Sequence, residues 1–311
     1  MVCWQMKGDT KGKLKSLIKG KISLDVPMAK YTSLGVGGRA DALAFPKDEE
    51  DIRVILQFAK ERTLPYFILG RGTNVIIRDG GFRGIVISLY HGFRRVKIIS
   101  RGDEEVLVYS EAGVNLKHLI RFTREKGLTG LEAFIGIPGT LGGALAMNAG
   151  AFGPEMKDVV KSVTVMEEMG AMVVKQRKEL RFSYRNLVLP KGSIILRAIL
   201  GVREAKQEEI VAKVKSFQRL RVQSQPWNMQ TAGSIFKNPE GTPAGQLIDE
   251  LGFKGHRIGG ARISEKHGNF IVNEGDATAA DVLSLMAFVR DTVYEKRGIR
   301  LTPEVHIIGE G

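Results

Sequence analysis

The sequence has almost no cysteine, because Cys3 is the only one in 311 residues. A disulfide framework within the chain is therefore excluded, and a reducing compartment fits. No stretch approaches the ~20 apolar residues of a membrane span. The first 28 residues also lack the apolar run of a signal peptide. We therefore expect a cytoplasmic protein without membrane insertion, and no reactive role for Cys3 so near the terminus.

Common metal-binding and serine-nucleophile motifs are missing as well. The five histidines show no spacing typical of metal ligands, so no bound metal is expected. Ser234 lies in the stretch TAGSIFKNP, but a G-x-S-x-G nucleophile frame would need glycine where Phe236 stands. On these residues alone, Ser234 is a nucleophile, a phosphate ligand or a structural serine in a turn. Asn269 either faces the cleft of the carboxyl-terminal domain or caps a turn, and we favour the turn cap.

Positive charge is in excess, since 47 Lys and Arg residues against 34 Asp and Glu leave a net charge of +13. This excess is typical of nucleic-acid binding, of small anionic ligands such as nucleotide diphosphates, or of a solvated surface. The densest basic segment is 210–225. Its apolar residues Ile210, Val214 and Phe217 recur at helical spacing, so its lysines are interpreted as the exposed face of a helix.

The hydrophobic pattern predicts alternating helices and strands. Helices are expected at 48–62, 115–127 and 278–298, with Asp48 and Asn115 as caps of the first two. Strands are expected at 41–45, 65–70, 84–89, 96–100, 105–113, 163–176 (a hairpin turning near 169–170) and 193–202. Because some strands form antiparallel-looking pairs, the fold class is α+β. We place a basic segment at 1–20, one domain at 21–203 with subdomains 21–90 and 91–203, and a second domain at 204–311.

Two glycine-rich clusters are candidate phosphate cradles. The first, at 67–82, runs from a strand into Gly70–Arg71–Gly72–Thr73–Asn74. The second, at 134–153, contains Pro138–Gly139–Thr140 and then Gly142–Gly143. Glycines let backbone N–H groups converge on an anion. Neither cluster is a Walker loop, and a G-x-G-x-x-G motif starting at Gly70 would need glycine at Val75. Together the two clusters favour a dinucleotide ligand.

The motifs as a set resemble those of one enzyme family. They are LGRGTNVIIRDGGFRGIVI, IPGTLGGALAMNAGAFG, FSYR, AGSIFKNP and TPEV, in that order between about residues 30 and 306. This set is similar to the UDP-N-acetylenolpyruvoylglucosamine reductase (MurB) family. The resemblance implies an FAD-binding domain of the p-cresol methylhydroxylase and vanillyl-alcohol oxidase type, made of two α+β subdomains, followed by an α+β substrate-binding domain whose last strand returns toward the flavin. The first cradle carries no His or Cys, so FAD is expected to be non-covalent.

The family's reaction gives each matching residue an implied role. NADPH reduces FAD, and the reduced flavin delivers hydride from N5 to C3 of the enolpyruvyl group of UDP-N-acetylglucosamine enolpyruvate, forming UDP-N-acetylmuramate for peptidoglycan. Arg185 and Glu304 then act on the enolate, and Ser234 donates a proton to C2. Tyr184, Lys237 and Asn238 are implied to bind substrate. The implied FAD-binding residues are Gly70, Arg71, Gly72, Thr73, Asn74, Ile137, Pro138, Gly139, Thr140, Gly142, Gly143 and Asn148.

The sequence departs from one subtype of the family, whose last domain carries a lid loop with tyrosines. Between Arg203 and Gly311 the only tyrosine is Tyr294, inside the expected helix. The chain therefore resembles the shorter subtype. We also expect the protein to be a monomer and not to bind nucleic acid. Two other interpretations stay open, namely another FAD-dependent oxidoreductase or oxidase of the same superfamily and a basic nucleic-acid-binding protein.

Overall fold

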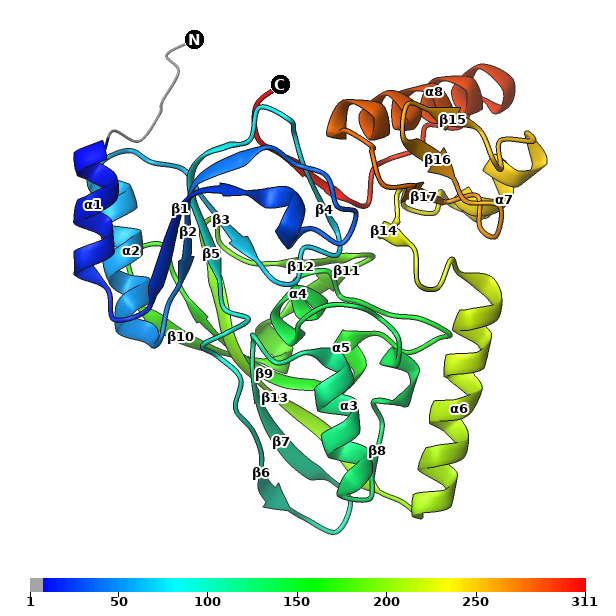
Figure 1. The fold of residues 1–311 in the computed structure, drawn as a ribbon. Helices are drawn as coiled ribbons and strands as arrows, with labels where there is room; N and C mark the ends of the chain where they lie inside the picture. Colours follow the sequence, from blue (N-terminus) through cyan, green and yellow to red (C-terminus); the bar gives the residue numbers. More distant parts are fainter. Residues whose placement is uncertain (1–7) are drawn as a thin grey trace.

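The computed structural model describes residues 8–311, so Cys3 lies outside the described residues. The helices and strands form three units that pack together (Figure 1). The first two units share one large hydrophobic core, and a separate core fills the carboxyl-terminal unit. Among residues 8–311, no helix has the length and apolar character needed to cross a bilayer.

The first unit is a four-stranded sheet with two helices. Its strand order is β1-β2-β5-β3. The β1–β2 pair is antiparallel, and the β2–β5 and β5–β3 pairs are parallel. Asp48 caps α2 by accepting a hydrogen bond from the Asp51 backbone N–H, as predicted. The elements are α1 (Gly8–Leu17), β1 (Lys21–Pro27), η1 (Met28–Tyr31), β2 (Arg39–Phe45), α2 (Glu49–Glu61), β3 (Tyr66–Leu69), β4 (Val75–Ile77) and β5 (Phe82–Ser88).

The second unit is built on an antiparallel sheet of order β10-β9-β13-β7-β6, with β8 paired to the far end of β13. The predicted hairpin is present as β9 and β10. The elements are β6 (Val96–Arg101), β7 (Val106–Glu111), α3 (Leu116–Glu125), β8 (Leu128–Thr129), η2 (Glu132–Phe134), α4 (Leu141–Ala146), α5 (Met156–Val159), β9 (Val160–Met166), β10 (Met172–Gln176), η3 (Arg177–Glu179), β11 (Arg181–Ser183), β12 (Asn186–Val188) and β13 (Ile194–Glu204).

The basic segment 210–225 falls almost entirely on helix α6 (Gln207–Ser224). This helix contacts η2 and α3 of the second unit (Figure 1). Ile210 and Val214 are buried while Lys213 and Lys215 are exposed, so the predicted amphipathic arrangement is confirmed. The expected domain division at 203/204 falls just before α6, and the next sheet begins only at β14. The division itself stays a prediction.

The carboxyl-terminal unit is a four-stranded sheet of order β14-β17-β16-β15 with two helices. Its elements are β14 (Gln230–Ser234), α7 (Ala244–Glu250), β15 (Arg257–Ile258), β16 (Ala261–Ile263), β17 (Phe270–Asn273) and α8 (Ala279–Arg297). The predicted helix at 278–298 is thus confirmed, with Thr278 as its cap and Gly298 in the left-handed region at its end.

The last strand leaves this unit and returns to the first one. Strand β18 (His306–Ile308) pairs in parallel with β4, which directly follows Gly70–Asn74 within the first glycine cluster (Figure 1). The segment before β18 therefore lies where all three units meet. This pairing places Glu304, two residues before β18, beside the first glycine cluster.

Candidate active site

The two glycine clusters lie against each other. The Thr73 hydroxyl donates a hydrogen bond of 3.0 Å to the Pro138 carbonyl oxygen. A Cβ added at Gly70 would lie 2.8 Å from Thr140 Oγ1, so the close approach of the two loops depends on the missing side chain. Clusters 65 residues apart in sequence therefore form one continuous lining.

This lining has the properties that a nucleotide cofactor needs. Gly72 has φ +62° and Gly139 has φ +143°, backbone conformations that favour glycine. A Cβ at Gly72 would also overlap the Tyr31 carbonyl oxygen. Within the described part of the chain, the backbone N–H groups of Arg71, Gly72 and Thr73 donate no hydrogen bond. Unpaired backbone donors in a glycine-rich loop are suited to an anionic diphosphate, so the residues present fit FAD.

Arg185 is held at the tip of the β11–β12 hairpin, in a two-residue turn formed with Tyr184. Its φ of +56° lies in the left-handed region, which is unusual for a residue with a side chain. Its guanidinium carbon lies 5.0 Å from the centroid of the Tyr184 ring. The turn thus presents a cation and an aromatic ring together.

The Arg185 guanidinium faces two carboxylates. Its Nε lies 3.1 Å from Glu304 Oε1, and its Nη1 lies 3.9 Å from Glu155 Oε1. Glu304 is largely buried, with 15% of its side chain exposed. Burial raises the pKa of Glu304, while the positive charges of Arg185 and Lys237 oppose that rise. Glu304 is therefore closer to a neutral acid than an exposed glutamate would be.

Ser234 reaches the same place from the carboxyl-terminal sheet. It ends β14, and its neighbour Ile235 accepts a hydrogen bond of 2.8 Å from the Glu304 backbone N–H. Lys237 N–H in turn donates to the Thr302 carbonyl oxygen at 2.8 Å. Segments 235–237 and 302–304 therefore run side by side, and Ser234, Lys237 and Glu304 share one region.

The first glycine cluster is also tied to this region. The Asn74 amide donates a hydrogen bond of 3.1 Å to the Glu304 carbonyl oxygen. Gly233, just before Ser234, has φ +78°, and a Cβ there would lie 3.9 Å from the Thr73 carbonyl oxygen. The candidate cofactor cradle and the candidate catalytic residues are thus contiguous.

Several predicted ligand contacts have protein partners in the structure. Asn148 is fully buried; its amide donates to Glu155 (2.9 Å) and to the Ser183 carbonyl (3.2 Å), and it accepts from the Lys157 N–H (3.0 Å). The Asn238 side chain accepts from the Ala244 N–H at 3.0 Å, at the start of α7. Ligand contacts of Asn148 and Asn238 stay predictions, whereas their bonds to the protein position neighbouring segments.

Asn269 has a role that its interpretation as a turn cap missed. Its side chain accepts from the Phe236 N–H (2.9 Å) and donates to the Phe236 carbonyl (2.7 Å), thirty-three residues away. This pair of hydrogen bonds fixes the backbone just after Ser234. A contact across so many residues leaves no local sequence signal.

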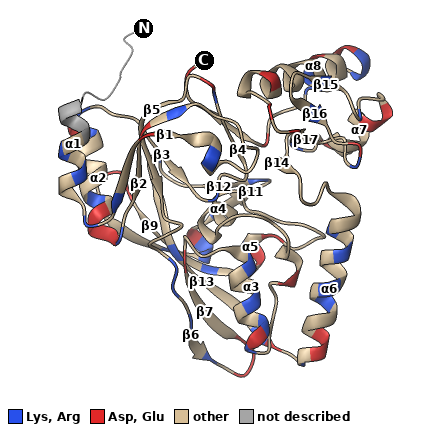
Figure 2. Cartoon of the chain, in the orientation of Figure 1, with Lys and Arg blue, Asp and Glu red and all other residues tan. Residues whose placement is uncertain are grey.

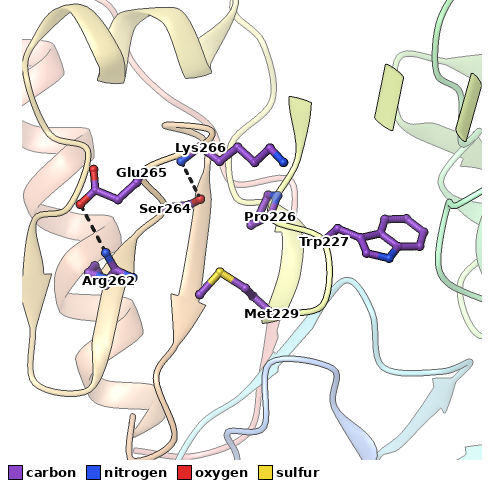
Figure 3. Close-up of a pocket in the computed structure, with 7 residues that line it drawn as sticks. All are labelled: Pro226, Trp227, Met229, Arg262, Ser264, Glu265 and Lys266. Atoms are coloured by element: carbon purple, nitrogen blue, oxygen red, sulfur yellow. Dashed lines mark hydrogen bonds and ion pairs between the residues drawn. The ribbon is translucent and has the colours of Figure 1, made fainter. Parts of the chain in front are cut away.

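Two cavities lie outside the predicted site residues. One, of about 180 Å³, lies between the linker that carries Trp227 and Met229 and the carboxyl-terminal sheet; Figure 3 shows Trp227 pointing away from the other lining residues. The other, of about 370 Å³, lies between α3 and α6 and is lined by Arg94, Lys117, Arg121, Arg124 and others. In Figure 2 the ribbon of both helices is blue at the positions of Lys and Arg. Neither cavity is lined by Arg185, Ser234 or Glu304.

Comparisons with known proteins agree with this arrangement. Residues 40–175 match the model of an FAD binding domain, and residues 225–308 match the model of the C-terminal domain of UDP-N-acetylenolpyruvoylglucosamine reductase. The predicted fold class, an α+β FAD-binding domain followed by a second α+β domain, is confirmed, as is FAD as the cofactor. The assignment of the first domain to the p-cresol methylhydroxylase and vanillyl-alcohol oxidase type stays a prediction.

Relatives match over nearly the whole chain. The UDP-N-acetylenolpyruvoylglucosamine reductase of Syntrophus aciditrophicus is 46% identical over 300 residues, covering 96% of both chains. That of Clostridioides difficile is 42% identical over 298 residues, again covering 96% of each. The crystal structure of the Thermus caldophilus enzyme superimposes with a TM-score of 0.79 at 37% identity, covering 93% of this chain and 99% of that one. The chain therefore belongs to the UDP-N-acetylenolpyruvoylglucosamine reductase family of flavoenzymes.

Proposed function

We propose that this enzyme uses NADPH to reduce UDP-N-acetylglucosamine enolpyruvate to UDP-N-acetylmuramate, a precursor of peptidoglycan. The observation that carries the proposal is the Arg185–Glu304 pair at 3.1 Å, adjoining both the glycine lining and the strand that ends in Ser234. The substrate brings a diphosphate and a carboxylate. The cationic side chains of Arg185 and Lys237 suit such an anion.

The two glycine clusters would hold FAD non-covalently, and the bound cofactor would pass a hydride from NADPH to C3 of the enolpyruvyl double bond. The electron pair of that bond moves onto C2 and its carboxylate. Arg185 stabilises this developing negative charge, because its guanidinium stays ionised and presents a planar pair of donors. Glu304, with its raised pKa, donates a hydrogen bond to the same enolate when protonated.

Ser234 completes the addition by donating its hydroxyl proton to C2. An alkyl hydroxyl is a weak acid, but a carbanion is a strong base, so no histidine partner is required. Tyr184 and Lys237 orient the substrate, and Asn269 holds the backbone beyond Ser234 in place. The product gains one hydrogen at C3 from the hydride and one at C2 from Ser234.

An absorbance titration tests the proposed function. The purified protein should be yellow, NADPH should bleach the flavin band without oxygen, and UDP-N-acetylglucosamine enolpyruvate should restore it stoichiometrically. An oxidase of the same fold would instead recover its colour rapidly with O₂ and ignore the enolpyruvyl compound. Failure of this compound to restore the colour would overturn the proposal.

A further inference from the structure

Helix α6 places a cation where its sequence pattern calls for a core residue. Ile210, Val214 and Phe217 form the stripe of α6 that faces η2 and α3. The next position on that stripe is Arg221, which is only 4% exposed. An arginine is almost never buried so deeply without a carboxylate partner, so Arg221 requires an explanation.

The structure gives Arg221 neutral partners only. Its Nε donates to the Ile135 carbonyl oxygen at 2.9 Å, and its Nη1 donates to Gln225 Oε1 at 3.2 Å. Its Nη2 is buried and has no hydrogen-bond partner within residues 8–311, and no ion pair of Arg221 is present there. Burial lowers the pKa of Arg221 to about 10, so the group remains charged at neutral pH.

Both ends of the second glycine cluster surround this guanidinium. Ile135 and Gly136 directly precede the Ile137–Thr140 turn, and the Phe152 ring centroid, near the end of the cluster, lies 5.4 Å from the guanidinium carbon. A Cβ at Gly136 would lie 2.5 Å from Arg221 Cδ, so the glycine makes room for the side chain. The cation is therefore held against the segment that lines the cofactor site.

We infer that Arg221 is a cofactor-binding residue whose unpaired Nη2 neutralises an anionic group of bound FAD. The inference rests on FAD occupying the glycine clusters. Two anionic groups of the cofactor share this chemistry, the pyrophosphate in every redox state and the isoalloxazine ring once it is reduced. Either would give the buried guanidinium the counter-ion that the protein does not supply.

The test compares Arg221→Met and Arg221→Lys with Arg219→Met, which removes the same charge from an exposed position of the same helix. Binding of FAD to flavin-free protein is followed by the quenching of flavin fluorescence, for which no turnover is needed. We expect Arg221→Met to raise the dissociation constant about 10- to 100-fold, the loss expected for one charge-assisted hydrogen bond. Arg221→Lys should lose less, and Arg219→Met should match the wild type.

Reduced FAD, prepared with dithionite under nitrogen, identifies the anionic group. If Arg221→Met weakens the binding of oxidised and reduced FAD equally, the anionic group is the pyrophosphate. If it weakens the binding of reduced FAD more, the anionic group is the ring. Both results support the inference.

An unchanged dissociation constant for FAD, together with a lowered melting temperature of flavin-free Arg221→Met, would overturn the inference and make Arg221 a purely structural residue. Should Arg221→Met fail to fold, an unchanged dissociation constant in folded Arg221→Lys, despite its lost fork geometry, would also overturn it. If the wild type itself bound no FAD, the cofactor assignment would fail instead.

Discussion

Arg185 Nε lies 3.1 Å from Glu304 Oε1, although 119 residues separate the two in the chain. The hairpin carrying Arg185 belongs to the second unit, and Glu304 lies on the segment that returns from the carboxyl-terminal unit to β4. One pair of side chains thus joins two units at the candidate active site.

Glu304→Gln should impair the oxidative half-reaction selectively. The amide keeps the shape of the side chain and can donate a hydrogen bond, but it is a far weaker acid than a protonated carboxyl group and stabilises the enolate less. Reoxidation of reduced flavin by the enolpyruvyl substrate should slow by roughly 10²–10⁴-fold, whereas flavin reduction by NADPH should be nearly unchanged in stopped-flow measurements. Glu295→Gln, an exposed change on α8, serves as the control. Equal slowing of both half-reactions would count against the assignment.

Ser234→Ala should retain FAD and should be reduced by NADPH at a near-normal rate. Without the hydroxyl proton, reoxidation by substrate should lose roughly 3–5 kcal/mol of transition-state stabilisation. Ser234→Cys should keep more activity, because a thiol can still donate a proton. In deuterated solvent the product should carry deuterium at C2. Normal turnover of Ser234→Ala, or a covalent substrate adduct on Ser234 by mass spectrometry, would exclude the proton-donor role.

The raised pKa of Glu304 predicts a pH dependence of stability. Because the folded protein holds this proton more tightly than the unfolded chain, the stabilising contribution is full below the ordinary glutamate pKa of about 4.3 and is lost as pH rises through the folded pKa. Flavin-free Glu304→Gln should therefore gain free energy of unfolding relative to the wild type as pH rises from about 4.3 through the folded pKa of Glu304. Urea unfolding measures this difference. A difference that shrinks with pH would mean that Arg185 stabilises the carboxylate instead.

Gly139→Ala should weaken FAD binding more than it weakens the fold. A Cβ there would enter the junction of the two glycine clusters, 3.3 Å from Thr73 Oγ1, at φ +143°. Gly275→Ala is the matched control, because its φ of +126° brings similar backbone strain while a Cβ would meet nothing within 4 Å. Both variants should lose comparable stability in thermal melts. Only Gly139→Ala should lose flavin on gel filtration, and retention of flavin by both would argue against the cradle.

The sequence by itself determined the elements whose signals are local. The helix caps at Asp48 and Asn115, the stripe of buried apolar residues along α8 and the alternating strands all follow from spacings of a few residues. The structure contains all of them. The glycine clusters and the motifs around Arg185, Ser234 and Glu304 could also be recognised in the sequence, because such short runs of residues rarely occur by chance. The family followed from their order along the chain.

Tertiary structure alone decided which residues meet. No local pattern shows that Asn269 binds the Phe236 backbone, that Asn148 ties the Arg185 hairpin to Glu155, or that Thr73 bonds Pro138. Arg221 lies on the buried stripe of α6, although the helical spacing of this segment predicts an exposed face for its lysines. Helical periodicity says which residues share a face, but the polarity of what that face meets depends on segments far away in sequence. Contacts of this kind are set by how the units pack together, because hydrogen bonds and burial depend on distance in space and leave no trace in neighbouring residues.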